Sequence, residues 1–98
     1  MPLIKMNTLT KNQIEEYKAI YDDATRLIQN QNWRSAEARC NDGADYWQQV
    51  IAPKLPAEER HRITCLKLGM TLASCFGNHE KAADEMNGLV AELEKIAA

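Results

Sequence analysis

The most strongly patterned stretch of the chain is residues 56–76, where apolar side chains recur at helical spacing. Read at 100° per residue, they form two stripes covering roughly two thirds of the circumference, more than the ~100° arc of a surface helix. We therefore expect this helix to be covered on two flanks, by its own chain or by a partner. The stripes comprise Ile63, Leu66, Met70 and Ala73 on one flank, and Cys65, Leu68, Leu72 and Cys75 on the other.

Three more segments repeat apolar residues at spacings of three and four, which predicts helices at about 11–29, 33–51 and 79–97. With 56–76 they define an all-α chain of four helices. The connectors are short, so we expect two consecutive antiparallel helical hairpins with the helix at 56–76 central. The length of 98 residues fits a single helical domain, 1–98, in which residues 1–9 form a short N-terminal arm.

Local signals mark where the first helix begins. Thr10 and Gln13 have the spacing of a capping box, and Leu9 and Ile14 have that of a hydrophobic staple. The arm before this cap is apolar at Leu3, Ile4 and Met6, a composition that suits packing on a neighbour as well as fraying.

The second helix contains a turn-like run, Asn41-Asp42-Gly43. Because the apolar spacing resumes in phase after it, we predict that the helix is continuous. Gly43 would then let a neighbouring helix approach closely, at a cost of about 1 kcal/mol relative to alanine. Asn32 and Asn78 are predicted to cap the second and fourth helices, and Pro53 to end the second.

The two interhelical turns align with each other, Gln31-Asn32-Trp33-Arg34-Ser35-Ala36 with Gly77-Asn78-His79-Glu80-Lys81-Ala82. The second, with Ala82 at the small packing position, resembles the interhelical turn of a tetratricopeptide repeat. The resemblance covers this turn alone, since the rest of that signature is absent and no third unit follows. It implies stacked helical pairs acting as an adaptor or chaperone.

Charge and composition exclude several classes of function. The formal net charge is −2, with Lys and Arg scattered among Asp and Glu, so the basic footprint of a nucleic-acid binder is missing. No apolar run approaches the length of a membrane span, and the N-terminus does not resemble a signal peptide. We expect a cytoplasmic protein without direct contact to nucleic acid or membrane.

The residues that usually carry chemistry do not form a site. Cys65 and Cys75 are ten residues apart on one helix, roughly 15 Å along its axis and too far for a bridge. With Cys40 they are expected to be reduced and buried. His61 and His79 lack ligand spacing, and adjacent carboxylates diverge by 100° on a helix. We predict no catalytic, cofactor-binding or metal-binding residues, and therefore a protein that is not an enzyme.

The remaining signals favour contact with another protein. Trp33 and Trp47 are nearly in phase and are predicted to enter the core, which turns Tyr46 away from it toward an interface. Lys67 joins the basic residues near the start of the third helix, which either meet an acidic partner or form a rim that balances Glu58 and Glu59; the rim is favoured. The candidate partner-binding residues are Tyr46, Pro53, Lys54, Arg60, Arg62, Leu68 and Leu72.

In size, helical pattern and mild acidity, the chain is similar to the anti-RecBCD accessory proteins of lambdoid phages. The resemblance rests on overall character, so no binding residue is carried over from it. It implies a phage-encoded inhibitor in the host cytoplasm that binds the RecBCD exonuclease-helicase and alters its action in DNA recombination.

Other interpretations stay open. The chain could self-assemble as a structural homodimer through its third and fourth helices. A pocket lined by Tyr17, Tyr21 and Trp47 could hold a small ligand. The Ala52-Pro53 and Leu55-Pro56 bonds could engage a prolyl isomerase, although both prolines are better explained as helix punctuation.

Overall fold

The structure, a computed structural model, describes residues 8–97. In this range the elements are helices and turns without a strand, so the predicted all-α fold is confirmed. Residues 1–7 of the predicted N-terminal arm lie outside the described residues. The elements are α1 (Lys11–Gln29), α2 (Trp33–Tyr46), the π-helical turn η1 (Trp47–Ile51), the 3₁₀ turn η2 (Ala52–Lys54), α3 (Ala57–Cys75) and α4 (His79–Ile96).

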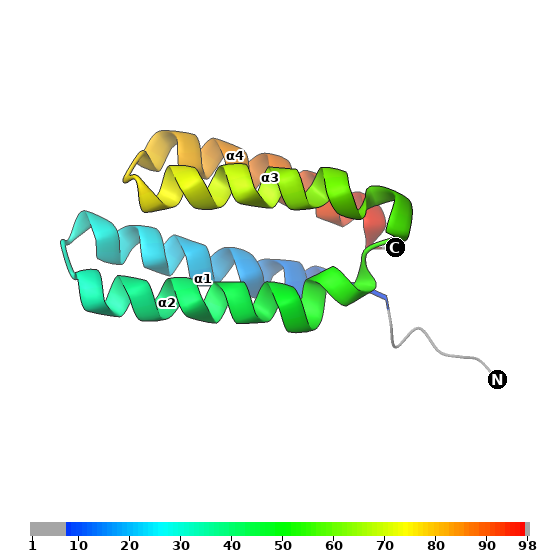
Figure 1. Cartoon of the computed structure of the whole chain (residues 1–98), viewed down its shortest axis with the longest axis horizontal. Coiled ribbons are helices and arrows are strands. Elements are labelled where there is room, and N and C mark those ends of the chain that lie inside the picture. The colour runs from blue at the N-terminus through cyan, green and yellow to red at the C-terminus, as the bar shows by residue number, and fades with distance from the viewer. Residues whose placement is uncertain (1–7, 98) are drawn as a thin grey trace.

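The helices pack mainly as sequence neighbours, α1 beside α2 and α3 beside α4 (Figure 1). α1 also contacts α4, η1 and, less extensively, α3, so it is the helix shared by the whole molecule. The prediction that the third helix is central was wrong. The physical reason is that α2 lies against α1, which leaves α3 packed chiefly on α4.

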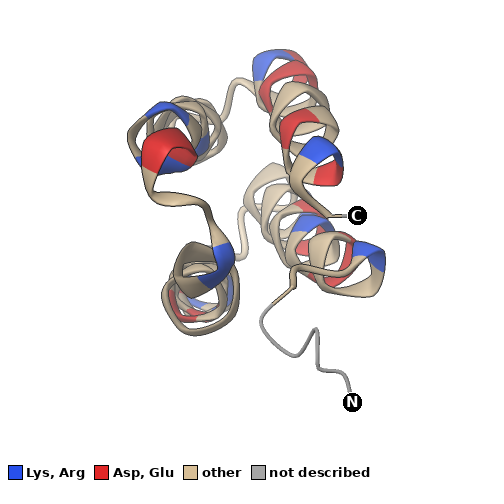
Figure 2. Ribbon diagram, turned by 90° about the vertical axis from the view of Figure 1, so that its right-hand side faces the viewer, with Lys and Arg blue, Asp and Glu red and all other residues tan. Residues whose placement is uncertain are grey.

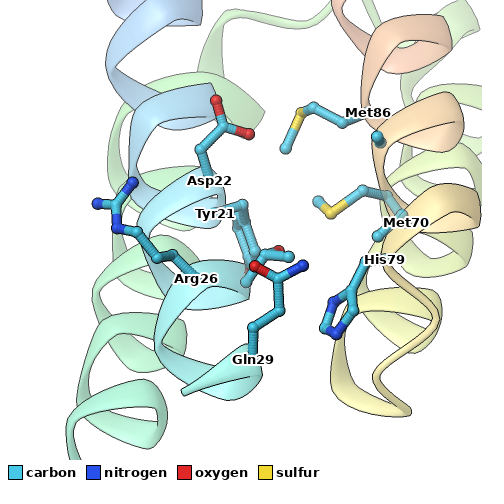
Figure 3. A pocket seen from close by; sticks show the side chains of 10 residues that line it. Tyr21, Asp22, Arg26, Gln29, Met70, His79 and Met86 are labelled. Atoms are coloured by element: carbon cyan, nitrogen blue, oxygen red, sulfur yellow. The ribbon is translucent and has the colours of Figure 1, made fainter. Parts of the chain in front are cut away.

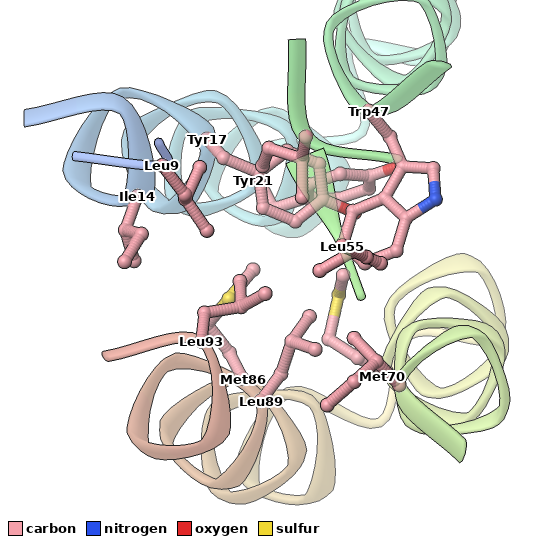
Figure 4. Close-up of a cluster of buried hydrophobic side chains, with 12 residues drawn as sticks. Leu9, Ile14, Tyr17, Tyr21, Trp47, Leu55, Met70, Met86, Leu89 and Leu93 are labelled. Carbon is pink, nitrogen blue, oxygen red and sulfur yellow. The ribbon is translucent and has the colours of Figure 1, made fainter. Parts of the chain in front are cut away.

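The core runs between the four helices and combines aromatic, aliphatic and sulfur side chains (Figure 4). On α1, Tyr17 packs edge-on against Tyr21, with ring centroids 5.1 Å apart. Trp47 from η1 lies 5.3 Å from Tyr17 between ring centroids, which ties the end of the second helix to α1. The other members are Leu9, Ile14, Ile51, Leu55, Ile63, Met70, Met86, Leu89 and Leu93.

The start of α1 is built as its sequence predicts. The Gln13 backbone N–H donates to Thr10 Oγ1 (3.2 Å), and the Thr10 backbone N–H donates to Gln13 Oε1 (3.1 Å), which completes the capping box. Leu9 and Ile14 are both buried, as expected for a hydrophobic staple. These contacts anchor the first helix to the core from its first turn.

The two interhelical turns share one backbone pattern. Gln31 and Gly77 both have positive φ, at 60° and 75°. The Asn32 N–H donates to Leu27 O, and the Asn78 N–H donates to Ala73 O, the long bond of a Schellman motif. Asn78 also caps α4 through the Lys81 N–H (3.2 Å).

Asn32 occupies the predicted cap position of α2 but makes no side-chain cap bond, so that part of the prediction was wrong. Its φ and ψ of −92° and 74° and its N–H bond to Leu27 O closely match those of Asn78, which does cap α4, so the backbone conformation does not explain the difference.

The second helix is continuous through Gly43, as predicted, and Gly43 is buried. A Cβ built at this position would meet Tyr21 Cε2 at 2.5 Å, so the absent side chain is what lets α2 approach α1. Beyond Tyr46 the helix widens to a π turn, in which the Ala52 N–H donates to Trp47 O. This wider turn lies directly before Pro53, whose ring is incompatible with a regular α turn.

Replacing Gly43 by alanine is expected to destabilise the fold by about 1–3 kcal/mol, because the new methyl group overlaps the Tyr21 ring. Gly88→Ala is the matched control, since it adds the same group to an α4 position with open space around it and should stabilise by up to about 1 kcal/mol. Urea unfolding of both variants measures this difference. Equal effects from the two substitutions would show that α2 does not approach α1 so closely.

Replacing Gln31 by glycine is expected to stabilise the protein by about 1 kcal/mol, because the left-handed conformation strains any residue with a Cβ. The control is the equivalent turn, where Gly77→Ala should destabilise by a similar amount. Thermal and urea unfolding check both changes. A neutral Gln31→Gly variant would contradict the turn geometry.

Candidate protein-interaction surface

The outward side of α3 carries an exposed apolar ridge. Leu68, Leu72 and Phe76 are 48%, 57% and 84% exposed. Cys65 and Cys75 are exposed as well. At 100° per residue these five positions fall within one face of the helix, which we call the α3 outer face. It is the largest group of exposed large apolar side chains on one helix in the described chain.

This exposure corrects the prediction that both flanks of the third helix are covered. On the other flank, Ile63, Met70 and Ala73 are buried as expected against α4 and the core, and Leu66 is half-buried. The flank of Leu68 and Leu72 is uncovered within the chain. The reason is geometric, because α2 packs extensively on α1, whereas α3 packs on α4 and touches the second helix's continuation, η1, through Lys67 and Trp47.

A shallow hollow of about 340 Å³ borders the α3 outer face on the side of α4. Leu72 and Phe76 form its apolar wall, and Lys81 and Glu85 of α4 form its charged wall. The Glu85 carboxylate lies over Gly69, where a Cβ would meet its Oε1 at 2.6 Å. The outer face is therefore an apolar ridge beside a groove that carries one charge of each sign.

Trp33 shows where the sequence interpretation failed, and Phe76 is an exposed aromatic residue for which the sequence analysis made no prediction. Trp33 is 61% exposed although its phase predicted burial, whereas Trp47 is buried as expected. Both exposed aromatics lie at a helix end, since Trp33 opens α2 and Phe76 follows the last residue of α3. The sequence signal for their exposure was their position at a helix end next to a turn, because the core does not extend as far as the turns.

Tyr46, predicted to turn toward an interface, makes its contacts inside the chain. Its hydroxyl donates to Glu16 Oε2 (2.7 Å) on α1, and its ring stacks on Tyr17 with centroids 6.4 Å apart. Burial, and then the hydrogen bond to Glu16, raise the pKa of Tyr46 above its ordinary value. Its role in the structure is to join η1 and α2 to α1.

The basic residues near the start of α3 are engaged on separate elements. Lys54 Nζ donates to Gln13 Oε1 (3.1 Å), and Arg60 donates to the Leu55 carbonyl (3.2 Å). Lys67 Nζ lies 5.8 Å from the centroid of the Trp47 ring. Positive and negative residues are interspersed along the helices (Figure 2), and the rim that balances Glu58 and Glu59 stays a prediction for these three residues.

Arg62 is paired with two carboxylates. It donates to Glu92 Oε1 on α4 (2.7 Å) and to Glu59 on its own helix. The hydrogen bonds to Glu59 and Glu92 raise the pKa of Arg62. Those from Arg62 and Lys95 lower the pKa of Glu92. Arg62 is exposed and Glu92 is partly exposed, so the α3–α4 pair is screened by solvent and contributes little to stability.

Of the predicted partner-binding residues, Leu68 and Leu72 thus lie together on the α3 outer face. Pro53 is exposed in η2, in the connector between the two helical pairs, and Pro56 is half-buried just before α3. The prediction of a prolyl isomerase at these bonds stays a prediction.

A second hollow, of about 250 Å³, lies on the other side of the molecule between α1 and the α3–α4 pair (Figure 3). Tyr21, Met70 and Met86 contribute apolar wall. The charges on its wall are paired along α1, Asp22 with Lys18 (2.8 Å) and Arg26 with Asp23. The hollow therefore has apolar walls, and the charges of Asp22 and Arg26 at its edge are balanced by ion pairs.

The predicted pocket of Tyr17, Tyr21 and Trp47 does not form. Tyr17 and Trp47 are core residues packed against each other, and only Tyr21 reaches the hollow. The Tyr17 hydroxyl is buried without a hydrogen-bond partner among the described residues. Burial, with a smaller contribution from neighbouring Tyr21, raises the pKa of Tyr17 above its ordinary range.

The cysteines and histidines also differ from expectation. Cys65 and Cys75 are exposed and Cys40 is intermediate, so the prediction of three buried thiols was wrong, because two of them lie on the uncovered flank of α3. His61 is exposed and His79 is half-buried beside the second hollow. Among residues 8–97, no group of three or more His, Cys, Asp or Glu side chains has the arrangement of a metal site.

Comparison with protein-family models, curated proteins and solved structures found no match to this chain. Within the described residues, the helices lack the combination of length and apolar content that a membrane span requires.

Proposed function

We propose that this protein is a non-enzymatic modulator that binds a larger protein through the α3 outer face. The observation that carries the proposal is the exposure of Leu68, Leu72 and Phe76 in helical register. Large apolar side chains gain about 1.5–3 kcal/mol each when they are transferred from water into a well-packed interface. A ridge of three is thus a binding determinant of useful size.

The surroundings of the ridge favour a protein partner. Lys81 and Glu85 flank the groove beside Leu72 and Phe76, which gives the apolar strip a polar border. Protein interfaces commonly combine an apolar, aromatic centre with a polar rim. An amphipathic helix of the partner, laid along the groove, would bury the ridge and keep its own polar side near these charges.

The first partner to test is the host exonuclease-helicase RecBCD. The support is the similarity in size and character to the anti-RecBCD accessory proteins of lambdoid phages. The formal net charge of −2 with mixed signs is too small for imitation of DNA, so the proposed mechanism is contact with a protein surface.

Self-assembly is the second candidate, because the same ridge could pack on its copy in a second chain. A twofold dimer would pack the ridge of one chain on the same ridge of the other. The experiment below separates these two occupants of one surface.

The test uses the tagged full-length chain to capture purified RecBCD, with nuclease activity measured in parallel. Leu72→Glu and Phe76→Glu each place a charge on the ridge and should weaken capture at least about tenfold, about 1.4 kcal/mol of binding free energy. The matched control is Ala91→Glu, which adds the same charge to the exposed side of α4, away from its core stripe. It should bind like the parent chain.

Circular dichroism establishes that all three variants keep their helices. Capture of RecBCD that is unaffected by both ridge variants would contradict the proposed surface, and lack of capture would contradict this partner. Light scattering of the free chain distinguishes the second candidate, since a dimer that Leu72→Glu dissociates would establish self-assembly in place of modulation.

A further inference from the structure

Cys40 of α2 and Cys75 of α3 lie at the same level of two neighbouring helices. α2 and α3 run in opposite directions (Figure 1), and the Lys67–Trp47 contact sets their register. Cys40 precedes Trp47 by seven residues, and Cys75 follows Lys67 by eight. At roughly 1.5 Å of rise per residue, the two cysteines therefore differ in level by about one residue.

Both cysteines also lie near the same residue of α1, Tyr21. Gly43, one turn after Cys40, is packed against the Tyr21 ring of α1. Ser74 precedes Cys75, and its hydroxyl oxygen lies 3.3 Å from that of Thr25. Thr25 is one turn after Tyr21 on α1. Tyr21 accordingly lies beside both thiols.

We propose that Cys40 and Cys75 are a modification site, an oxidisable pair of thiols that forms an intramolecular disulfide between α2 and α3. The co-reactant is a low-molecular-weight disulfide such as oxidised glutathione. This proposal does not depend on the proposed function, because it concerns the reactivity of the free chain. Cys65 lies about 80° around α3 from Cys75 and stays outside this bond.

The environment of each thiol indicates which of the two reacts first with the disulfide reagent. Cys75 is exposed, whereas Cys40 is partly buried. Burial, and then the neighbouring Cys75, raise the pKa of the Cys40 thiol, which makes its thiolate scarcer. Cys75 is therefore the thiol that attacks first, and Cys40 is the one that resolves the mixed disulfide.

The reaction is two thiol–disulfide exchanges. The Cys75 thiolate attacks one sulfur of oxidised glutathione, forms a mixed disulfide and releases one glutathione thiolate, which takes up the proton lost by Cys75. The Cys40 thiolate then attacks the Cys75 sulfur, which forms the Cys40–Cys75 bond and releases the second glutathione. The two protein thiols are oxidised, and one glutathione disulfide is reduced to two thiols.

The test treats the reduced full-length chain with oxidised glutathione and maps the products by mass spectrometry without reduction. The parent chain should contain a Cys40–Cys75 bond within one chain, while the exposed Cys65 stays outside that bond, free or carrying glutathione. Cys65→Ser is the matched control and should form the same bond. In Cys40→Ser a glutathione adduct should persist on Cys75, on the order of tenfold longer than in the parent chain or more.

Three outcomes would overturn the proposal. These are a stable glutathione adduct on Cys75 of the parent chain, a bond that includes Cys65, and bonds that form only between chains. The Cys65→Ser control removes the possibility that a reshuffled bond hides the original one.

Discussion

The close approach of α1 and α2 at Tyr21 and Gly43 is the contact on which the rest of the architecture depends. Because Gly43 has no side chain, the Tyr21 ring lies directly against the backbone of α2. The second helix is thereby committed to α1 along its length, through the Tyr46–Glu16 bond at one end and the Arg39–Asp23 pair (3.1 Å) further along. α1 then becomes the helix that all the others share.

This commitment explains the exposed surface. A helix in a four-helix arrangement normally has two extensive neighbours, but α3 has one, α4, with minor contacts to α1 and to Trp47 of η1. Its second apolar stripe is consequently left open at Leu68 and Leu72, and Phe76 extends it beyond the helix end. The proposed binding surface and the proposed thiol pair are both products of this incomplete closure between α2 and α3.

Local sequence rules predicted the helices well and their partners poorly. The capping box at Thr10, the continuity through Gly43 and the buried stripe of α3 each depend on residues close in sequence, and all three are present. The second apolar stripe of α3 was predicted correctly from its spacing. Whether a neighbouring helix covers this stripe depends on which helices pair, and periodicity does not encode that pairing. Trp33 was misassigned for a related reason, since phase predicts the side of a helix but not where the core ends.

The central claim is that the α3 outer face is open to solvent in the free protein. The most direct measurement is the NMR relaxation of leucine methyl groups by a soluble paramagnetic agent, at a concentration where the chain is monomeric. The methyl signals of Leu68 and Leu72 should be strongly broadened, whereas those of the core residues Leu89 and Leu93 should be protected. Protection of Leu68 and Leu72 equal to that of Leu89 would contradict the account.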